Sequence, residues 1–396
     1  MNDYLKLSRS GVHYRIVDLI APWLGRRRAN VVVGGERSES FLLENMVYQG
    51  TVLGPILWNL FFGDASRAIQ MLKFIETIFA DDLNAYRKYK ENVKNSTLIQ
   101  AAKKCQERLH EWGRANQAEF DPGKESITIL SRTNPVGEGF KIFNIHFDTR
   151  LCMEEAISNI CDKSAWKLRT LLRTSRFFST IHMVNLYKSK VLSYVEGKTP
   201  AIYHAASTQL QRVDRIQSRF MESAGMNEID ALCTYRLAPL TSRRDMALLG
   251  LIHRTVIGLG PKQFGEFFKL EEVVSHPNGR ESERKHKKQL VSHRQGHYLE
   301  ILGHSIFSLV DVYNLLPEHV VAAKDVTTFQ TGLQTNLIAA AKQGEYNWQQ
   351  MYSPRLAIYA HPLRKALGNG RTKTTMPDPS LSSKKTCINS WLKFAQ

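Results

Sequence analysis

The stretch Phe74-Ile-Glu-Thr-Ile-Phe-Ala-Asp-Asp-Leu-Asn-Ala-Tyr86 places two adjacent aspartates between short apolar segments. This pattern predicts a β-hairpin over about 72–90, with Asp81 and Asp82 at its bend. Neighbouring carboxylates repel one another, so a bound cation is a physical reason to place them together. A tight turn also lets both side chains face one point. Aspartate is common in turns, so the pair alone is weak evidence for a site.

The segments around this hairpin predict further strands and helices. Gln49-Gly-Thr-Val-Leu-Gly-Pro55 predicts a turn that leads into an apolar helix over 56–69. Apolar residues recur at steps of three or four over 98–112, which predicts a helix with one buried face. Strands are expected over 126–130 and 140–147. Together these segments predict a sheet with helices packed on it.

The composition restricts the class of protein. The 396 residues include 54 Lys and Arg against 37 acidic residues, a net charge of +17. This excess favours a polyanionic partner, and the plain alternative is a merely soluble basic protein. The five cysteines include no Cys-x-x-Cys pair, which argues against a zinc site and predicts buried, reduced thiols.

The N-terminus shows no signal-peptide pattern. The longest apolar run, near 52–62, is too short to cross a bilayer, which takes ~20 residues. We therefore expect an intracellular protein, nuclear or cytoplasmic, with no membrane association.

The order of these segments resembles the palm of reverse transcriptases encoded by non-LTR (LINE-type) retrotransposons. Gln49–Pro55 resembles the family's motif B, and Phe79–Asp82 resembles motif C. Trp112–Leu130 resembles motif D, and Phe140–Asp148 resembles the primer-grip strand. Weaker similarity extends the match over roughly residues 4–335.

The resemblance implies an α+β fold: an incomplete polymerase palm, with an antiparallel sheet and packed helices, followed by a helical thumb and a mostly helical extension. The expected domains are a partial palm (1–150), thumb and connection helices (151–235), a C-terminal extension (236–365) and a disordered polar tail (366–396).

The resemblance also implies two-metal nucleotidyl transfer with Mg²⁺ or Mn²⁺, a dNTP, an RNA template and a DNA primer. Asp81 and Asp82 would bind the metal, and Lys124 would lie near the triphosphate as a proton donor to pyrophosphate. The residues expected to line the template–nucleotide pocket are Gln49, Gly50, Thr51, Gly54, Pro55, Phe79 and Ala80. The residues expected to contact duplex phosphates are Lys163, Lys167, Arg169 and Arg173. The alternative for Lys124 is a solvated turn lysine. The alternative for the four basic residues is an ordinary solvated helix face.

The family's motif A supplies another essential metal-binding aspartate at the end of a strand. Tyr4–Leu7 resembles the helix that follows this motif, so motif A is expected just before Met1. Neither Asp3 nor Asp18 fits its role, and the fingers are missing too. We therefore expect a reverse transcriptase (RNA-directed DNA polymerase) fragment that is inactive alone, with an open strand edge where motif A would pair.

Two other functions stay open. One is a non-catalytic RNA- or DNA-binding protein derived from a retroelement. The other is a splicing factor resembling intron maturases, whose characteristic C-terminal domain is not evident in this sequence.

Overall fold

The structure is a computed structural model that describes residues 2–23, 25, 27–43, 50–90, 92–271, 286–292, 303–365 and 390–394. It has mixed α+β architecture with small antiparallel sheets, as the sequence predicts at that level. The chain divides into two units. The first contains residues 1–141, 148–150 and 385–396, and the second contains 142–147 and 151–384.

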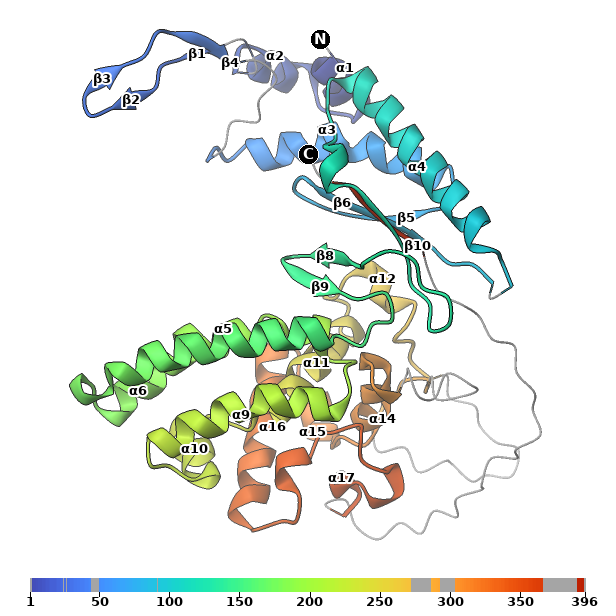
Figure 1. The fold of residues 1–396 in the computed structure, drawn as a ribbon. Coiled ribbons are helices and arrows are strands. Elements are labelled where there is room, and N and C mark those ends of the chain that lie inside the picture. The colour runs from blue at the N-terminus through green and yellow to red at the C-terminus, as the bar shows by residue number, and fades with distance from the viewer. Residues whose placement is uncertain are drawn as a thin grey trace. The chain divides into compact units, whose positions relative to one another are not determined.

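The first unit is built on a four-stranded sheet with the order β5-β6-β10-β7. Its strands are β5 (Ile75–Phe79), β6 (Asp82–Arg87), β7 (Ser126–Ile129) and β10 (Ser390–Phe394). Each neighbouring pair is antiparallel, and the predicted Asp81–Asp82 hairpin is confirmed as β5–β6. In Figure 1 the red strand β10 lies beside the blue strand β6.

The strand β10 corrects one expectation. Residues 390–394 were expected to be part of a disordered tail, but they pair with two strands at once. Residues 366–389 and 395–396 of that tail lie outside the described residues. The strand β6 is not an edge strand, because it pairs with β5 on one side and with β10 on the other.

Two long helices pack on one face of this sheet, α3 (Gly54–Gln70) and α4 (Asn95–Asn116). Pro55 lies in the first turn of α3, where a missing backbone N–H costs no hydrogen bond. The core between helices and sheet contains Phe62, Ala65, Ile69, Leu83, Ala85, Ala102, Cys105 and Leu109. The periodic apolar residues of 98–112 therefore face the sheet as predicted.

Shorter elements complete the first unit. The helix α1 (Asn2–Arg9) is fixed to α3 by Lys6, whose Nζ donates to Phe61 O at 2.9 Å and to Asp64 Oδ1 at 3.1 Å. The remaining elements are α2 (Tyr14–Trp23), the pair β1 (Arg27–Ala29) and β4 (Phe41–Leu43), and the pair β2 (Val32–Val33) and β3 (Glu36–Arg37).

The segment 140–147, predicted as one strand, is a hairpin of β8 (Phe140–Ile142) and β9 (Ile145–Phe147). Phe143 and Asn144 at its turn both have positive φ, +47° and +59°. Two successive residues of this kind form the tight turns typical of two-residue hairpins, and asparagine tolerates that conformation well. The turn therefore divides the expected strand.

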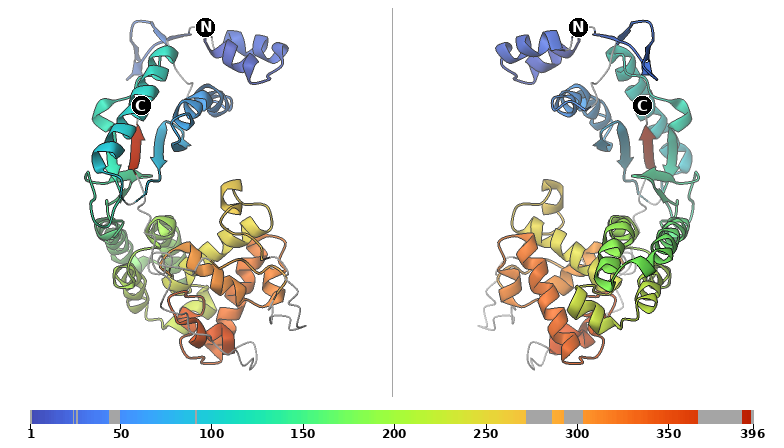
Figure 2. Two further views of the ribbon diagram at one scale, coloured as in Figure 1. Left: turned by 90° about the vertical axis from the view of Figure 1, so that its right-hand side faces the viewer. Right: turned by 90° about the vertical axis from the view of Figure 1, so that its left-hand side faces the viewer.

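The second unit is helical. Its helices are α5 (Glu154–Arg173), α6 (Thr180–Tyr187), α7 (Ser193–Glu196), α8 (Thr199–Ile202), α9 (Ser207–Ser223), α10 (Glu228–Tyr235), α11 (Leu240–Val256), α12 (Lys262–Gly265), α14 (Leu309–Asn314), α15 (Glu318–Val321), α16 (Val326–Lys342) and α17 (Pro362–Lys365). One hydrophobic cluster joins α5 to α9, and another joins α11 to α14 and α16. In both views of Figure 2 the yellow helix α11 lies against orange helices of this unit.

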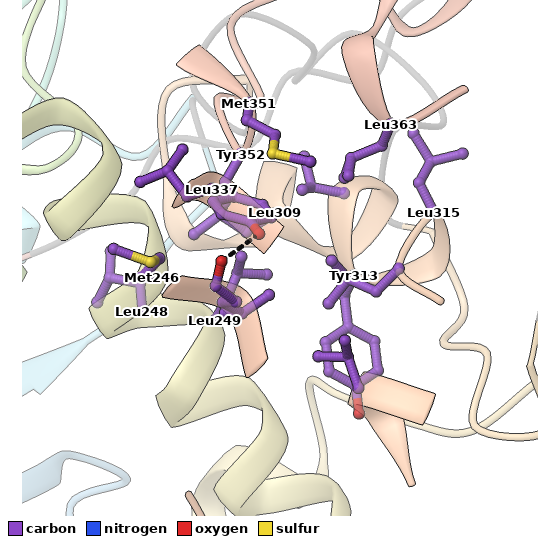
Figure 3. Close-up of a cluster of buried hydrophobic side chains, with 14 of the residues drawn as sticks. Met246, Leu248, Leu249, Leu309, Tyr313, Leu315, Leu337, Met351, Tyr352 and Leu363 are labelled. Atoms are coloured by element: carbon purple, nitrogen blue, oxygen red, sulfur yellow. Dashed lines mark hydrogen bonds between the residues drawn. The ribbon is translucent and has the colours of Figure 1, made fainter. Parts of the chain in front are cut away.

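Figure 3 shows the second of these clusters, where Leu249, Leu309, Tyr313 and Leu337 are fully buried. The hydroxyl of Tyr352 donates a hydrogen bond to Leu333 O at 2.7 Å, so this buried polar atom has a partner. The cluster gives the second unit its own core.

Within the described part of the chain, no helix is long and apolar enough to cross a membrane.

Four cysteines are described and none of them forms a disulfide. Only Cys105 is buried, whereas Cys152 is exposed, so the expectation of buried thiols is wrong for Cys152.

Candidate functional site

The Asp81–Asp82 turn is fixed to α3. Ala80 and Asp81 form the two-residue turn between β5 and β6, and Ala80 adopts a left-handed conformation with φ of +53°. Trp58 of α3 donates from Nε1 to Ala80 O at 2.7 Å, and its ring stacks on Phe62 at 5.2 Å. Asp81 is exposed and Asp82 is half-buried. No ion pair engages either carboxylate among the residues that the structure describes.

The sheet places Lys124 at the same end as this turn. Lys393 of β10 pairs with Asn84 of β6 on one side and with Ser126 of β7 on the other. Asn84 and Ser126 are therefore aligned across two strand spacings, about 10 Å. Because β6 and β7 run parallel to each other, residues just before both strands lie at one sheet end. Lys124 thus shares that end with Asp82.

Lys124 ends a short 3₁₀ turn, Pro122–Lys124. The carboxylate of Asp121 accepts from Gly123 N at 2.9 Å, which fixes the turn. The Lys124 Nζ lies 3.7 Å from Asp121 Oδ2, and its side chain is 57% exposed. An exposed ion pair of this kind is weak, so Lys124 can turn toward an anionic ligand.

The predicted pocket residues that precede α3 lie next to the turn. Thr51 Oγ1 accepts a hydrogen bond from Gly54 N at 3.2 Å, and Gly54 and Pro55 begin α3. Because Trp58 in the next helical turn bonds Ala80 O, this helix start lies beside the hairpin bend. Phe79, the last residue of β5, is 61% exposed.

Gly50 and Gln49 are the other two pocket residues predicted before α3. Gly50 has φ of +83°, a conformation that favours glycine, and no atom outside its immediate neighbours would contact an added Cβ. Gln49 lies outside the described residues.

The oxygen donors at the turn suit a magnesium ion. Asn84 follows Asp82 by two residues on β6, so both side chains belong to one face of the strand. Asn84 is only 5% exposed, and its Oδ1 has no hydrogen-bond partner among the described residues. Mg²⁺ takes one or two carboxylates and completes its shell with phosphate oxygens and water. The described residues contain no group of three or more His, Cys, Asp or Glu side chains that could hold a metal. Asp81, Asp82 and Asn84 thus offer carboxylate and amide oxygens within four successive residues.

Sequence reasoning missed Asn84. The available signal was its position two residues after Asp82, because side chains two residues apart on a strand lie on the same face.

The four basic residues predicted on the helix after the palm form two pairs. With about 100° of rotation per residue, Lys163 and Lys167 lie on one side of α5, and Arg169 and Arg173 lie roughly 120° away. Trp166 lies between the pairs and is 63% exposed. Lys167 is half-buried, with Nζ 5.5 Å from the ring centre of Tyr194. The four residues that were expected to contact duplex phosphates therefore lie on a wide face of α5 with the Trp166 ring between them.

Sequence reasoning missed a second basic row, on α9. Arg212, Arg215 and Arg219 follow one another at i, i+3 and i+7, and with Cys161 of α5 they line a hollow of about 260 Å³. Arg212 braces the two helices by donating to Ser158 Oγ at 3.3 Å, while Arg215 and Arg219 are exposed. Burial raises the pKa of the Cys161 thiol, and Arg212 opposes that rise. The helical spacing of the arginines was the signal available in the sequence.

No protein-family model, curated protein or solved structure matches the chain. The features of the chain that bear on function are therefore the aspartate turn with its neighbours in the first unit and the basic helices of the second.

Proposed function

We propose that the first unit is a partial reverse transcriptase palm of the non-LTR type. The chain is then a retrotransposon-derived fragment of an RNA-directed DNA polymerase, whose chemistry is two-metal nucleotidyl transfer. The observation that carries this proposal is the Asp81–Asp82 turn, which Trp58 fixes to the start of α3 and which shares its sheet end with Lys124.

Each residue at this sheet end has a role in the proposed chemistry. Asp81 and Asp82 would hold Mg²⁺ or Mn²⁺, and a bound ion would supply positive charge against the charge that develops on the transferring phosphoryl group. Lys124 is a flexible exposed cation that orients the triphosphate and protonates the departing pyrophosphate. Gly50 has no side chain, so a template or nucleotide can approach the backbone closely.

Metal binding tests the site directly. We expect Mn²⁺ with dTTP to bind the full chain, and we expect Asp81→Asn with Asp82→Asn to abolish that binding, because the paired carboxylates supply the protein's charge to the metal. Electron paramagnetic resonance of Mn²⁺ measures the bound fraction. The matched control is Glu154→Gln with Glu155→Gln, another adjacent acidic pair, at the start of α5. Equal losses in both variants, or no bound Mn²⁺ in the parent chain, would reject the site.

Primer extension tests the expectation that residues 1–396 are inactive alone. Two metals need a further carboxylate to bridge them, and no third acidic side chain joins Asp81 and Asp82 within the described residues. We therefore expect no extension of a DNA primer on an RNA template with Mg²⁺ or Mn²⁺. Extension that Asp81→Ala abolishes would contradict this expectation and would make the chain a polymerase.

A second candidate function, non-catalytic RNA or DNA binding, is favoured by the basic faces of α5 and α9. Those faces belong to the second unit and need neither Asp81 nor Asp82. Under this candidate, nucleic acid binds with a strong salt dependence. Mn²⁺ and dTTP then show no binding that depends on the aspartate pair, so the metal experiment separates the two functions.

A further inference from the structure

In the sheet of the first unit, β6 and β7 are not neighbours, and one strand position lies between them. The chain runs from β6 through α4 to β7, and these two strands are parallel to each other because both are antiparallel to β10. They do not pair directly, since each bonds to an opposite edge of β10. A βαβ unit of this split kind needs an antiparallel strand in the middle.

The strand that fills this position comes from the other end of the chain. Residues Ser390 to Phe394 pair with Arg87 back to Leu83, and residues Ser390 to Lys393 pair with Ile129 back to Ser126. Without a strand there, the backbone groups of β6 and β7 that face β10 would lose their partners, in strands that contain buried residues such as Ala85 and Thr128. A strand in this position therefore stabilises the sheet.

The register defines what kind of strand fits. Leu392 is aligned with Ala85 and Ile127, and Phe394 is aligned with Leu83. Those three partners belong to the core beneath α3 and α4. On β6 the core positions alternate, because Leu83 and Ala85 belong to the core and Asn84 lies on the other face of the strand. The site selects an extended segment with apolar residues at alternate positions.

The connectivity makes the occupant exchangeable. No tight turn joins β10 to β6 or β7, because residues 366–389 separate it from the preceding helix α17. A segment that can leave without breaking a loop of the sheet can be replaced by another copy or by an added peptide.

We propose that the position between β6 and β7 is a strand-acceptor site, filled in this structure by the chain's own residues 390–394. An extended peptide with the same alternation competes for it in trans. This inference rests on the pairing, register and connectivity of β10, so it stands or falls independently of the proposed function.

A disulfide trap in the full chain tests the register. In a Cys387→Ser background, Ser126→Cys with Lys393→Cys places two thiols on directly paired residues. The control, Thr128→Cys with Lys393→Cys, shifts one thiol by two residues along the same strand face. Paired residues across a sheet have the spacing that a disulfide needs, whereas diagonal residues are farther apart. We expect rapid oxidation of the first pair and at least tenfold slower oxidation of the second. Equal rates, or no disulfide in either, would overturn the pairing.

A peptide competition tests exchange. The probe is a fluorescent peptide of residues 386–396 with serine at 387, and anisotropy measures its binding to full chains. Leu392→Pro in the chain removes a backbone donor from β10 and should empty the site, so we expect at least tenfold tighter binding than to the parent chain. The same peptide with proline at 392 should not bind.

The disulfide-locked 126–393 chain is the second control, because its acceptor site is filled by a folded chain. It should bind no peptide until a reductant is added. Peptide binding that ignores the lock, or that tolerates the proline, would overturn the proposal, as would failure to bind the reduced, unlocked chain at any concentration tested.

Discussion

A chain that carries Arg169→Gln, Arg215→Gln and Arg219→Gln is expected to bind an RNA–DNA duplex roughly 10- to 100-fold more weakly near 0.1 M salt. All three arginines are exposed, on α5 and α9 of the second unit. Each phosphate contact that is lost lowers the slope of log affinity against log salt by about one, so the slope should fall by about three. Anisotropy titrations at four or five salt concentrations measure both quantities.

The matched control changes the net charge by the same amount on other surfaces of that unit. Lys262→Gln, Lys269→Gln and Lys342→Gln replace three exposed lysines away from α5 and α9. The affinity of this lysine variant for the duplex, and its salt slope, should change much less than those of the arginine variant. Equal changes in the two variants would mean that overall charge, and not these helices, attracts nucleic acid. Trp166→Ala should weaken single-strand binding further if bases stack on that exposed ring.

The features that sequence located correctly are all local. The β5–β6 hairpin follows from two apolar segments around Asp81 and Asp82, and α4 follows from apolar residues repeating every three or four positions. The basic helix α5 is read in the same way, since its buried residues keep helical spacing from Ala156 to Leu171. Local periodicity fixes which face of each element is buried, and tertiary packing does not alter it.

The features that sequence missed depend on contacts between distant segments. The strand β10 is five residues long and follows a polar segment, so composition pointed to disorder. Its pairing partners lie some 260 to 310 residues earlier in the chain, and no local pattern encodes such a register. The shared sheet end of Lys124 and Asp82 was hidden for the same reason, because it depends on which strand separates β6 from β7.

A buried carboxyl in the second unit predicts a second large effect, on stability. Asp245 of α11 accepts a hydrogen bond from the Tyr203 hydroxyl at 2.6 Å. The nearest arginines are engaged elsewhere: Arg244 makes a two-bond pair with Asp214 at 2.6 and 3.0 Å, and Arg355 donates to Tyr203 O at 2.6 Å. Burial therefore dominates and raises the pKa of Asp245 to about 7, although the Tyr203 hydrogen bond and both arginines oppose the rise.

The sign of the pH effect follows from linkage. In the unfolded chain the Asp245 carboxyl has its ordinary pKa of 3.8, so between about pH 4 and pH 7 the folded state holds a proton that the unfolded state has lost. The free energy of unfolding therefore falls as the pH rises through this window and stays low above it. A shift from 3.8 to about 7, at about 1.4 kcal/mol for each pKa unit, sets an upper limit of about 4 kcal/mol on the loss.

Replacing Asp245 by asparagine should remove this loss, because the amide has no proton to release and its oxygen can still accept from Tyr203. We expect Asp245→Asn to match the parent chain near pH 4, where the parent has lost little of this stability, and to be more stable by about 2–4 kcal/mol near pH 8. Amide hydrogen exchange of α11 reports this unit alone, and Glu222→Gln on α9 controls for a changed charge at the surface. Parallel pH profiles for Asp245→Asn and the parent would show that the carboxyl ionises normally. A variant that is weaker at both pH values would show instead that Asp245 is a carboxylate stabilised by Arg244 and Arg355.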